Sequence, residues 1–177
     1  MQYTAHYESP LGGLLLAADN VGLTGLWCDG EKYYALHLAR EHEMRQTAVH
    51  EQTAAWLDVY FSGREPDFMP PLHLIGTPFQ QEVWALLRQI PYGKTTTYGA
   101  LAKTLAAQRG LERMSAQAVG GAVGHNEISI LVPCHRVVGT GGSLTGYAGG
   151  VDKKKALLEL EGVSMEGLFV PKRGTAL

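Results

Sequence analysis

Three short, mainly apolar segments follow one another at the amino-terminal end of the chain, at residues 3–7, 14–18 and 23–27. The two gaps between them, residues 9–13 and 19–22, are rich in glycine, proline, asparagine and aspartate, which favour tight turns. The pattern predicts a β-meander of three strands.

Two stretches with helical spacing come next, at residues 32–40 and 51–61. In the second stretch Trp56 and Tyr60 are four residues apart and share one face of a helix. Gly63 lies where that helix should end. Strands and helices together predict a small α/β domain.

A stiff linker is expected at residues 64–76, which contain Pro66, Pro70 and Pro71. We therefore predict two domains, an amino-terminal structural domain over residues 1–76 and a second domain over residues 77–177.

The second domain is predicted to open with a capped helix, because Thr77, Pro78 and Gln80 fit a capping box with proline in the first turn. Its apolar face should form core and contains Phe79, Val83, Trp84, Leu86, Leu87 and Ile90.

Two further helices resemble a helix-turn-helix, one capped by Thr97 and ending near residue 106, the other capped by Ser115 and ending near residue 123. The second is rich in small residues: Ala116, Ala118, Gly120, Gly121 and Ala122. Such a face permits close approach, either of another helix or of a DNA groove. The second domain should therefore be mainly helical.

An apolar run at residues 128–132 predicts a buried strand that ends at Pro133. Cys134, His135 and Arg136 follow directly. A cation or base beside a cysteine converts the thiol to the thiolate, which attacks electrophiles. The alternative is a small buried cysteine with no chemical role, the commoner fate of a lone cysteine.

Residues 139–150 contain six glycines, so this segment can adopt conformations that fit closely around a flat ring. A last helix is expected from a cap at Asp152 to Glu161. Its first turn contains Lys153, Lys154 and Lys155, which we expect in solvent or facing phosphate. The tail, residues 164–177, has no strong pattern and is predicted to be loosely held.

Composition is that of an ordinary globular protein, with 45% hydrophobic and 18% charged residues. No apolar run is long enough for a membrane span, and the first residues lack the pattern of a secretory signal, so we expect a cytosolic location. The net charge of −2 argues against binding nucleic acid by bulk charge, but it does not exclude a small contact face.

No metal site is predicted. The two cysteines, Cys28 and Cys134, are far apart in sequence, and neither belongs to a Cys-x-x-Cys pair. Three histidines of the first domain lie among charged residues without ligand spacing and are predicted to be exposed: His37, His42 and His50.

The segment Pro133-Cys134-His135-Arg136-Val137 resembles the active-site signature of the O6-alkylguanine-DNA alkyltransferases. Asn126, the segment 147–150 and Glu161 stand at the spacing of that family, so the resemblance covers residues 77–162. It implies a ribonuclease-H-like amino-terminal domain and a winged-helix-like second domain with the helix-turn-helix.

The resemblance also implies a function. The protein would repair O6-alkylguanine, and O4-alkylthymine, in double-stranded DNA that it binds through the minor groove. After the base is flipped out of the helix, Cys134 would accept the alkyl group. Because a thioether is not reversed, the protein would act once and without a cofactor. It would be a monomer, with cooperative binding on DNA left open.

The resemblance assigns catalytic roles to five residues. Cys134 would be the nucleophile, His135 would take its proton through a water, and Glu161 would orient the histidine. Tyr98 would bond or protonate the base at N3, and Asn126 would tie the small-residue helix to the cysteine segment by backbone bonds.

The base itself would meet the carbonyls of Cys134 and Val137, the amide of Ala148, the neighbouring Gly149, and the ring of Tyr147 stacked on it. Many relatives have serine where this chain has Ala148, but the backbone amide is unaffected. DNA contacts are expected from Gln117, Ala118, Gly120, Gly121, Tyr98 and Arg136.

Two departures from the family pattern concern DNA handling. Gln117 occupies the position where an arginine usually fills the space of the flipped base, and residues 107–115 form a longer segment than usual. An arginine of that segment, Arg109 or Arg113, could reach the DNA instead.

Two other function classes compete with this interpretation. A non-transferring lesion sensor of the same fold would lack the cysteine of the signature, but this chain retains Cys134. A cysteine hydrolase using Cys134 and His135 would need an oxyanion site, and nothing outside the signature suggests one.

Overall fold

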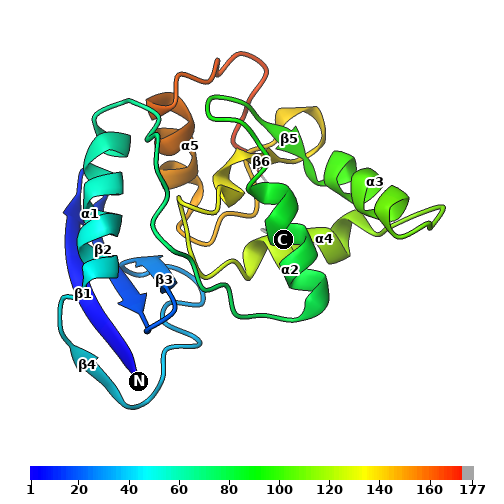
Figure 1. Cartoon of the computed structure of the whole chain (residues 1–177). Helices are drawn as coiled ribbons and strands as arrows, with labels where there is room; N and C mark the ends of the chain where they lie inside the picture. Colours follow the sequence, from blue (N-terminus) through cyan, green and yellow to red (C-terminus); the bar gives the residue numbers. More distant parts are fainter. Residues whose placement is uncertain (173–177) are drawn as a thin grey trace. The chain divides into compact units, whose positions relative to one another are not determined.

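The computed structural model describes residues 1–172, which form two compact units (Figure 1). The first unit consists of Met1–Ile75 and Glu127–Ser129, and the second of Gly76–Asn126 and the chain from Ile130 onward. The three residues of Glu127–Ser129 were expected in the second domain, because sequence pattern gave no reason to separate them from their neighbours.

A four-stranded sheet in the order β3-β2-β1-β4 forms the centre of the first unit. The strands β1 (Gln2–Ser9), β2 (Gly12–Ala18) and β3 (Leu23–Cys28) are antiparallel neighbours, so the predicted meander is confirmed. The strand β4 (His42–Met44) pairs parallel to β1 and was not predicted.

The helix α1 (Ala48–Phe61) confirms the second predicted helix, although it begins three residues earlier than expected. His50 explains this start, because its Nδ1 accepts a hydrogen bond of 3.0 Å from the backbone N–H of Thr47, the N-cap residue. His50 is only 1% exposed, so the prediction that it is solvated was wrong. Burial lowers the pKa of His50 and favours the neutral ring that this bond requires.

The helix predicted at residues 32–40 does not exist. This stretch forms a series of turns, with backbone bonds from Tyr34 to Glu31, from Leu36 to Tyr33 and from Leu38 to Ala35. Tyr33 and Ala35 have φ angles of 64° and 52°, which interrupt any right-handed helix. The apolar spacing instead serves packing, because Ala35 and Leu38 cover the cluster Leu15, Ala17 and Trp27.

The outer edge of β3 is covered by two separate segments of the first unit. The N–H of Leu23 bonds the carbonyl of Pro71 at 2.8 Å, within the stretch predicted to be linker. Further along β3, the N–H of Leu26 bonds the carbonyl of Glu127 at 2.8 Å, and the N–H of Ser129 bonds the carbonyl of Leu26 at 3.2 Å. The edge strand therefore has few unpaired backbone groups.

The second unit is mainly helical, as predicted. It contains α2 (Pro78–Leu87), α3 (Tyr98–Gln108), α4 (Ala116–Gly124), α5 (Val151–Leu160) and the short parallel pair β5 (Thr96–Thr97) and β6 (Val137–Val138).

The predicted caps of three helices are confirmed. The side chains of Thr77, Thr97 and Ser115 each accept a hydrogen bond from the backbone N–H three residues later. The apolar face of α2 is core, and within it Trp84 donates from Nε1 to the carbonyl of Ala122 at 2.9 Å. This bond fixes α2 against α4.

The strand predicted at residues 128–132 is absent. Only Ile128 makes a β-bridge, and Ile130 has a φ of 72°, so the chain turns instead of extending. The apolar run correctly signalled burial, but a buried turn and a buried strand give the same signal. Cys134 consequently lies in a single 3₁₀ turn, η1 (Cys134–Arg136), and not at the end of a strand.

Two expectations for the carboxy-terminal part were also wrong. Gly150, with a φ of 98°, is the N-cap of α5, and Asp152 is already inside the helix. Part of the tail is well packed, because Leu144 bonds the carbonyl of Phe169 at 2.8 Å and Phe169 bonds that of Gly142 at 3.1 Å. The rest of the predicted loose tail, residues 173–177, lies outside the described residues.

Among residues 1–172, no helix is long and apolar enough to cross a membrane.

Candidate active site

Cys134 is buried at the start of its 3₁₀ turn, with 7% of its surface exposed. The side-chain amide of Asn126, two residues beyond the end of α4, donates to the carbonyl of Val132 at 2.8 Å and to Sγ of Cys134 at 3.3 Å. The tie between the helix and the cysteine segment was expected from backbone bonds, but the side chain of Asn126 makes these two bonds. A donor directed at sulfur favours the thiolate over the thiol.

His135 and Glu161 form a buried pair. Nε2 of His135 lies 2.5 Å from Oε2 of Glu161, and neither side chain is exposed to solvent. Because a carboxylate only accepts, Nε2 carries the hydrogen, and in the neutral ring Nδ1 is the basic atom. Burial lowers the pKa of His135, and the bond and charge of Glu161 partly oppose this. The ring is therefore neutral near pH 7 and able to take a proton.

The other oxygen of Glu161 is held as firmly. Oε1 accepts from Nε of Arg136 at 2.8 Å and from the backbone N–H of Gly93 at 3.1 Å. Burial alone would raise the pKa of Glu161, but His135 and Arg136 outweigh it and lower the pKa to about 2. The carboxylate thus stays charged throughout the physiological range.

Arg136 points into the protein. Besides Glu161 it binds the carbonyl of Ile90 through Nη1 at 2.7 Å, and the residue is only 9% exposed. The prediction that Arg136 contacts DNA is therefore wrong. A guanidinium engaged with a carboxylate and a carbonyl in the interior is not available to phosphates.

Lys154 is fully buried, contrary to the expectation that the three lysines of α5 are solvated. Its Nζ donates to the carbonyl of Val137 at 2.5 Å and to that of Thr145 at 2.6 Å. Burial lowers the pKa of Lys154 to about 8, while the charge of Cys134 acts in the opposite direction. The interaction is mutual, so the ammonium favours the Cys134 thiolate.

Tyr98, the first residue of α3, is buried and donates from its hydroxyl to the carbonyl of Thr145 at 3.0 Å. Burial, and to a smaller extent the charge of Cys134, raises its pKa, so the hydroxyl keeps its proton. Tyr98 also lines a surface hollow of about 350 Å³. The other residues that line this hollow are Gly99, Ala116, Gln117, Gly139, Thr140 and Thr145.

The residues expected to bind the base lie in the glycine-rich segment and beside it. Tyr147 is buried, with its ring edge-on to that of His135 at 6.5 Å between centroids. Ala148 and Gly149 are half-buried in the turn that the bond from Gly150 to the carbonyl of Tyr147 closes. The carbonyl of Val137 is bonded by Lys154 and retains a second lone pair.

The remaining residues predicted to contact DNA all lie on α4, and they differ in exposure. Gln117 and Ala118 are exposed, and a side chain built on Gly121 would meet no atom within 4 Å. This face therefore has no partner within the described residues. Gly120 is buried instead, so for this glycine packing against the protein is the correct explanation and a DNA contact is not.

Two family models match the chain. The model described as "6-O-methylguanine DNA methyltransferase, ribonuclease-like domain" covers residues 2–74, and the one described as "6-O-methylguanine DNA methyltransferase, DNA binding domain" covers residues 78–163. The chain belongs to the 6-O-methylguanine DNA methyltransferase family.

Relatives within this family are similar over nearly their whole length. A methylated-DNA–protein-cysteine methyltransferase of Mycobacterium tuberculosis is 43% identical over 159 residues, which cover 88% of this chain and 92% of the relative. One of Methanosarcina acetivorans is 40% identical over 161 residues, with coverage of 90% and 98%.

The crystal structure of Mycobacterium tuberculosis OGT in complex with DNA has 42% identity and a TM-score of 0.77, with coverage of 90% of this chain and 92% of that one. The predicted fold class, family and methyltransferase activity are confirmed by these findings.

The hydrogen-bond network around Cys134 includes more residues than the sequence indicated. Cys134, His135, Glu161 and Asn126 are brought together as expected, whereas the support from Lys154 and Arg136 was missed. Helix phase could have revealed Lys154, because Lys154, Leu157, Leu158 and Glu161 recur on one face of α5.

Proposed function

We propose that this chain repairs DNA by moving the alkyl group from O6 of guanine, or O4 of thymine, to Sγ of Cys134. The new bond joins the alkyl carbon to sulfur, and the carbon–oxygen bond to the base breaks. The thiol proton leaves through His135, and a proton is returned to the base as it departs. The supporting observation is the buried His135–Glu161 pair directly next to the cysteine.

Each neighbour of Cys134 has a role in forming or using the thiolate. His135, neutral near pH 7, accepts the proton through a water, and Glu161 stabilises the imidazolium that results. Asn126 donates to the sulfur, and the Lys154 ammonium adds a favourable charge. Because Tyr98 stays protonated, its hydroxyl can donate to N3 of the base once it gives up its bond to the Thr145 carbonyl.

The base would be held largely by backbone groups. The carbonyls of Cys134 and Val137 accept from the guanine amino group, the amide of Ala148 donates to O6, and Tyr147 stacks on the ring, with Gly149 leaving room beside it. The buried position of Tyr147 next to His135 supports this arrangement. The glycine-rich backbone permits such close approach to a flat ring.

DNA would approach from the side of α4, through its minor groove. The exposed face with Gln117, Ala118 and Gly121 has short side chains, which suits a narrow groove. The related mycobacterial structure in complex with DNA supports DNA as the partner. Residues 77–177 would carry both DNA binding and alkyl transfer, and residues 1–76 would have a structural role. The whole protein would act as a monomer.

Intact-protein mass spectrometry tests the proposal. Incubation with duplex DNA that contains O6-methylguanine should add one methyl group per molecule, and peptide mapping should place it on Cys134. Cys134→Ser should gain none yet still bind the DNA, because a hydroxyl is a far weaker nucleophile. The matched control Cys28→Ala removes the other cysteine, which is also buried, and should still be methylated.

The competing functions give different results in the same experiment. A lesion sensor would bind the DNA without any gain in mass in the unmodified protein. A hydrolase would turn over repeatedly without a stable adduct. Either outcome would overturn the proposal.

A further inference from the structure

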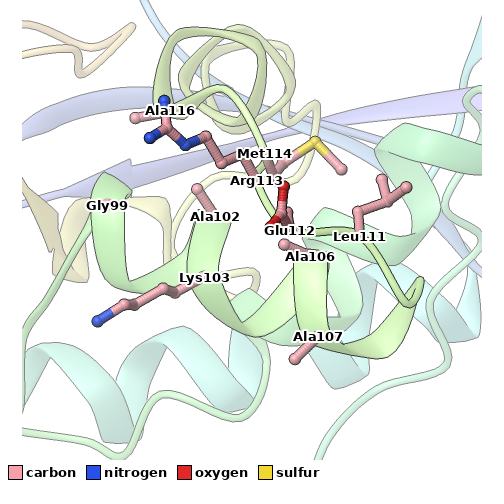
Figure 2. A pocket seen from close by; sticks show the side chains of 10 residues that line it. All are labelled: Gly99, Ala102, Lys103, Ala106, Ala107, Leu111, Glu112, Arg113, Met114 and Ala116. Atoms are coloured by element: carbon pink, nitrogen blue, oxygen red, sulfur yellow. The ribbon is translucent and has the colours of Figure 1, made fainter.

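A second groove on the surface of the second unit lies between α3 and the segment that connects α3 to α4 (Figure 2). Its volume is about 500 Å³. The residues that line it are Gly99, Ala102, Lys103, Ala106, Ala107, Leu111, Glu112, Arg113, Met114 and Ala116. Much of the wall consists of glycine and alanine, so a ligand could approach the helix closely.

The groove carries two unpaired cations. Lys103 and Arg113 are both exposed, and in the part of the chain that the structure describes neither forms an ion pair. In Figure 2 the side chain of Arg113 extends toward Ala116 and that of Lys103 extends below Gly99, while Leu111 lies at the opposite end. One carboxylate, Glu112, also lines the groove, so its net charge is positive.

The remaining cation of this region is already engaged. Arg109 pairs with Glu82 at 2.6 Å, and its guanidinium lies 5.3 Å from the centre of the Phe79 ring. Of the two arginines in the lengthened segment, only Arg113 is therefore available to a ligand. Arg109 and Arg113 thus form a natural pair of test and control residues.

The groove adjoins the hollow lined by Tyr98. Gly99 and Ala116, the second residue of α3 and the first of α4, line both. Gln117 lines the hollow only, and Arg113 lines the groove only. A ligand that enters the hollow beside Tyr98 and continues past the two helix starts therefore meets Lys103 and Arg113.

We propose that this groove binds the sugar–phosphate backbone of the DNA strand next to the flipped nucleotide, with Lys103 and Arg113 each contacting a phosphate. The inference rests on the proposed function, because it takes the hollow beside Tyr98 as the point where the flipped nucleotide enters. The positive charge of the groove suits phosphate. Contacts with phosphates fix the position of a protein along the DNA without reading the base sequence. The lengthened segment is thus a backbone clamp, and the place of the flipped base is left to Gln117.

Salt dependence of binding tests the clamp directly. Each phosphate contact contributes about 0.9 to the slope of log K against log salt for double-stranded DNA. In proteins that all carry Cys134→Ser, affinity for a labelled duplex with O6-methylguanine is measured over a range of salt concentrations. Lys103→Gln and Arg113→Gln should each lower the slope by about 0.9 and the double variant by about 1.8.

Two matched variants serve as controls. Arg109→Gln removes a cation that is already paired, so the slope should stay unchanged. Glu112→Gln removes a carboxylate from the groove itself and should strengthen binding, because the repulsion from phosphate is lost. All four substituted positions are exposed at the surface. The melting temperature of each variant should match that of the parent protein, which checks that it folds.

The outcomes separate this inference from the function on which it rests. If the unmodified protein transfers methyl groups but Lys103→Gln and Arg113→Gln leave the slope unchanged, the clamp is wrong and the proposed function stands. An effect of Arg113→Gln on base flipping alone, followed with 2-aminopurine opposite the lesion, would make Arg113 a stack-filling residue and also overturn the clamp. Absence of transfer by the unmodified protein refutes the function itself.

Discussion

The Glu161 carboxylate joins the two residues that follow Cys134 in the chain: one oxygen binds His135, and the other binds Arg136. The buried Glu161 carboxylate therefore positions both His135, the base that activates Cys134, and the guanidinium of Arg136. Because the carboxylate has a pKa of about 2, it keeps its charge at every pH at which the protein is expected to work.

Glu161→Gln should move the acidic limb of the rate–pH profile to higher pH. The glutamine no longer stabilises the imidazolium, so His135 is a weaker acceptor and the Cys134 thiolate forms only at higher pH. On the acidic limb, the rate should fall about tenfold for each pH unit that the limb moves. Single-turnover rates with methylated duplex from pH 5 to pH 9 measure this.

The control for that variant is Glu159→Gln. This glutamate is on the same helix, about half exposed, and pairs only with Lys155 at 3.8 Å. Its profile should match that of the unmodified protein. If Glu161→Gln also leaves the profile unchanged, Glu161 has no part in the proton relay.

Arg136→Met should slow transfer to duplex DNA and to free O6-benzylguanine by the same factor. The reason is that Arg136 acts inside the protein, where it orients Glu161, and not on the DNA. Loss of one partner of a buried ion pair should also lower the free energy of unfolding by about 3–5 kcal/mol. If Arg136→Met slowed transfer to duplex DNA only, the result would support the expectation from the sequence that Arg136 contacts DNA.

Lys154→Met should raise the pKa of the Cys134 thiol. The variant lacks the buried ammonium that favours the thiolate, although methionine retains most of the packing volume. The rate of iodoacetamide modification of Cys134 against pH reports that pKa. The modification rates of the variant and the unmodified protein should become more similar above about pH 8, because Lys154 itself loses its proton there.

Lys155→Met is the matched control, because this neighbouring lysine is half exposed and pairs with Glu159. An equal effect of both substitutions would indicate a general field of the helix and not a specific contact of Lys154.

Gln117→Arg should speed transfer to duplex DNA and leave the reaction with free O6-benzylguanine unchanged. A guanidinium fills the space of a flipped base and donates several hydrogen bonds, whereas glutamine is shorter and neutral. The gain should be about 1–2 kcal/mol, or roughly tenfold in rate. Equal acceleration of both substrates would show that Gln117 does not act on flipping.

Elements with local signals were predictable from the sequence. The caps at Thr77, Thr97 and Ser115 each need only one side chain and a nearby N–H, so short-range pattern locates three helix starts. The family signature likewise pointed to Cys134, His135 and Glu161, which the structure brings close together, since the signature is tied to spacing along the chain.

Features that depend on distant partners were missed. Ile130 adopts a left-handed conformation because the chain must turn between its bridge at Ile128 and the cysteine, which no local pattern encodes. The burial of Arg136 likewise depends on the carbonyl of Ile90 and on Glu161, 46 and 25 residues away. The family resemblance predicted that this residue contacts DNA.

Glu127–Ser129 make the first unit discontinuous in the sequence. Besides their backbone bonds to Leu26, Oε2 of Glu127 accepts a bond of 3.1 Å from Nε1 of the buried Trp27. A gene fragment that encodes only Met1–Ile75 would leave these groups of β3 unsatisfied and expose an edge strand that can pair with other chains. The amino-terminal part is therefore not a portable module, and shuffling it between genes would require its three distant residues to travel with it.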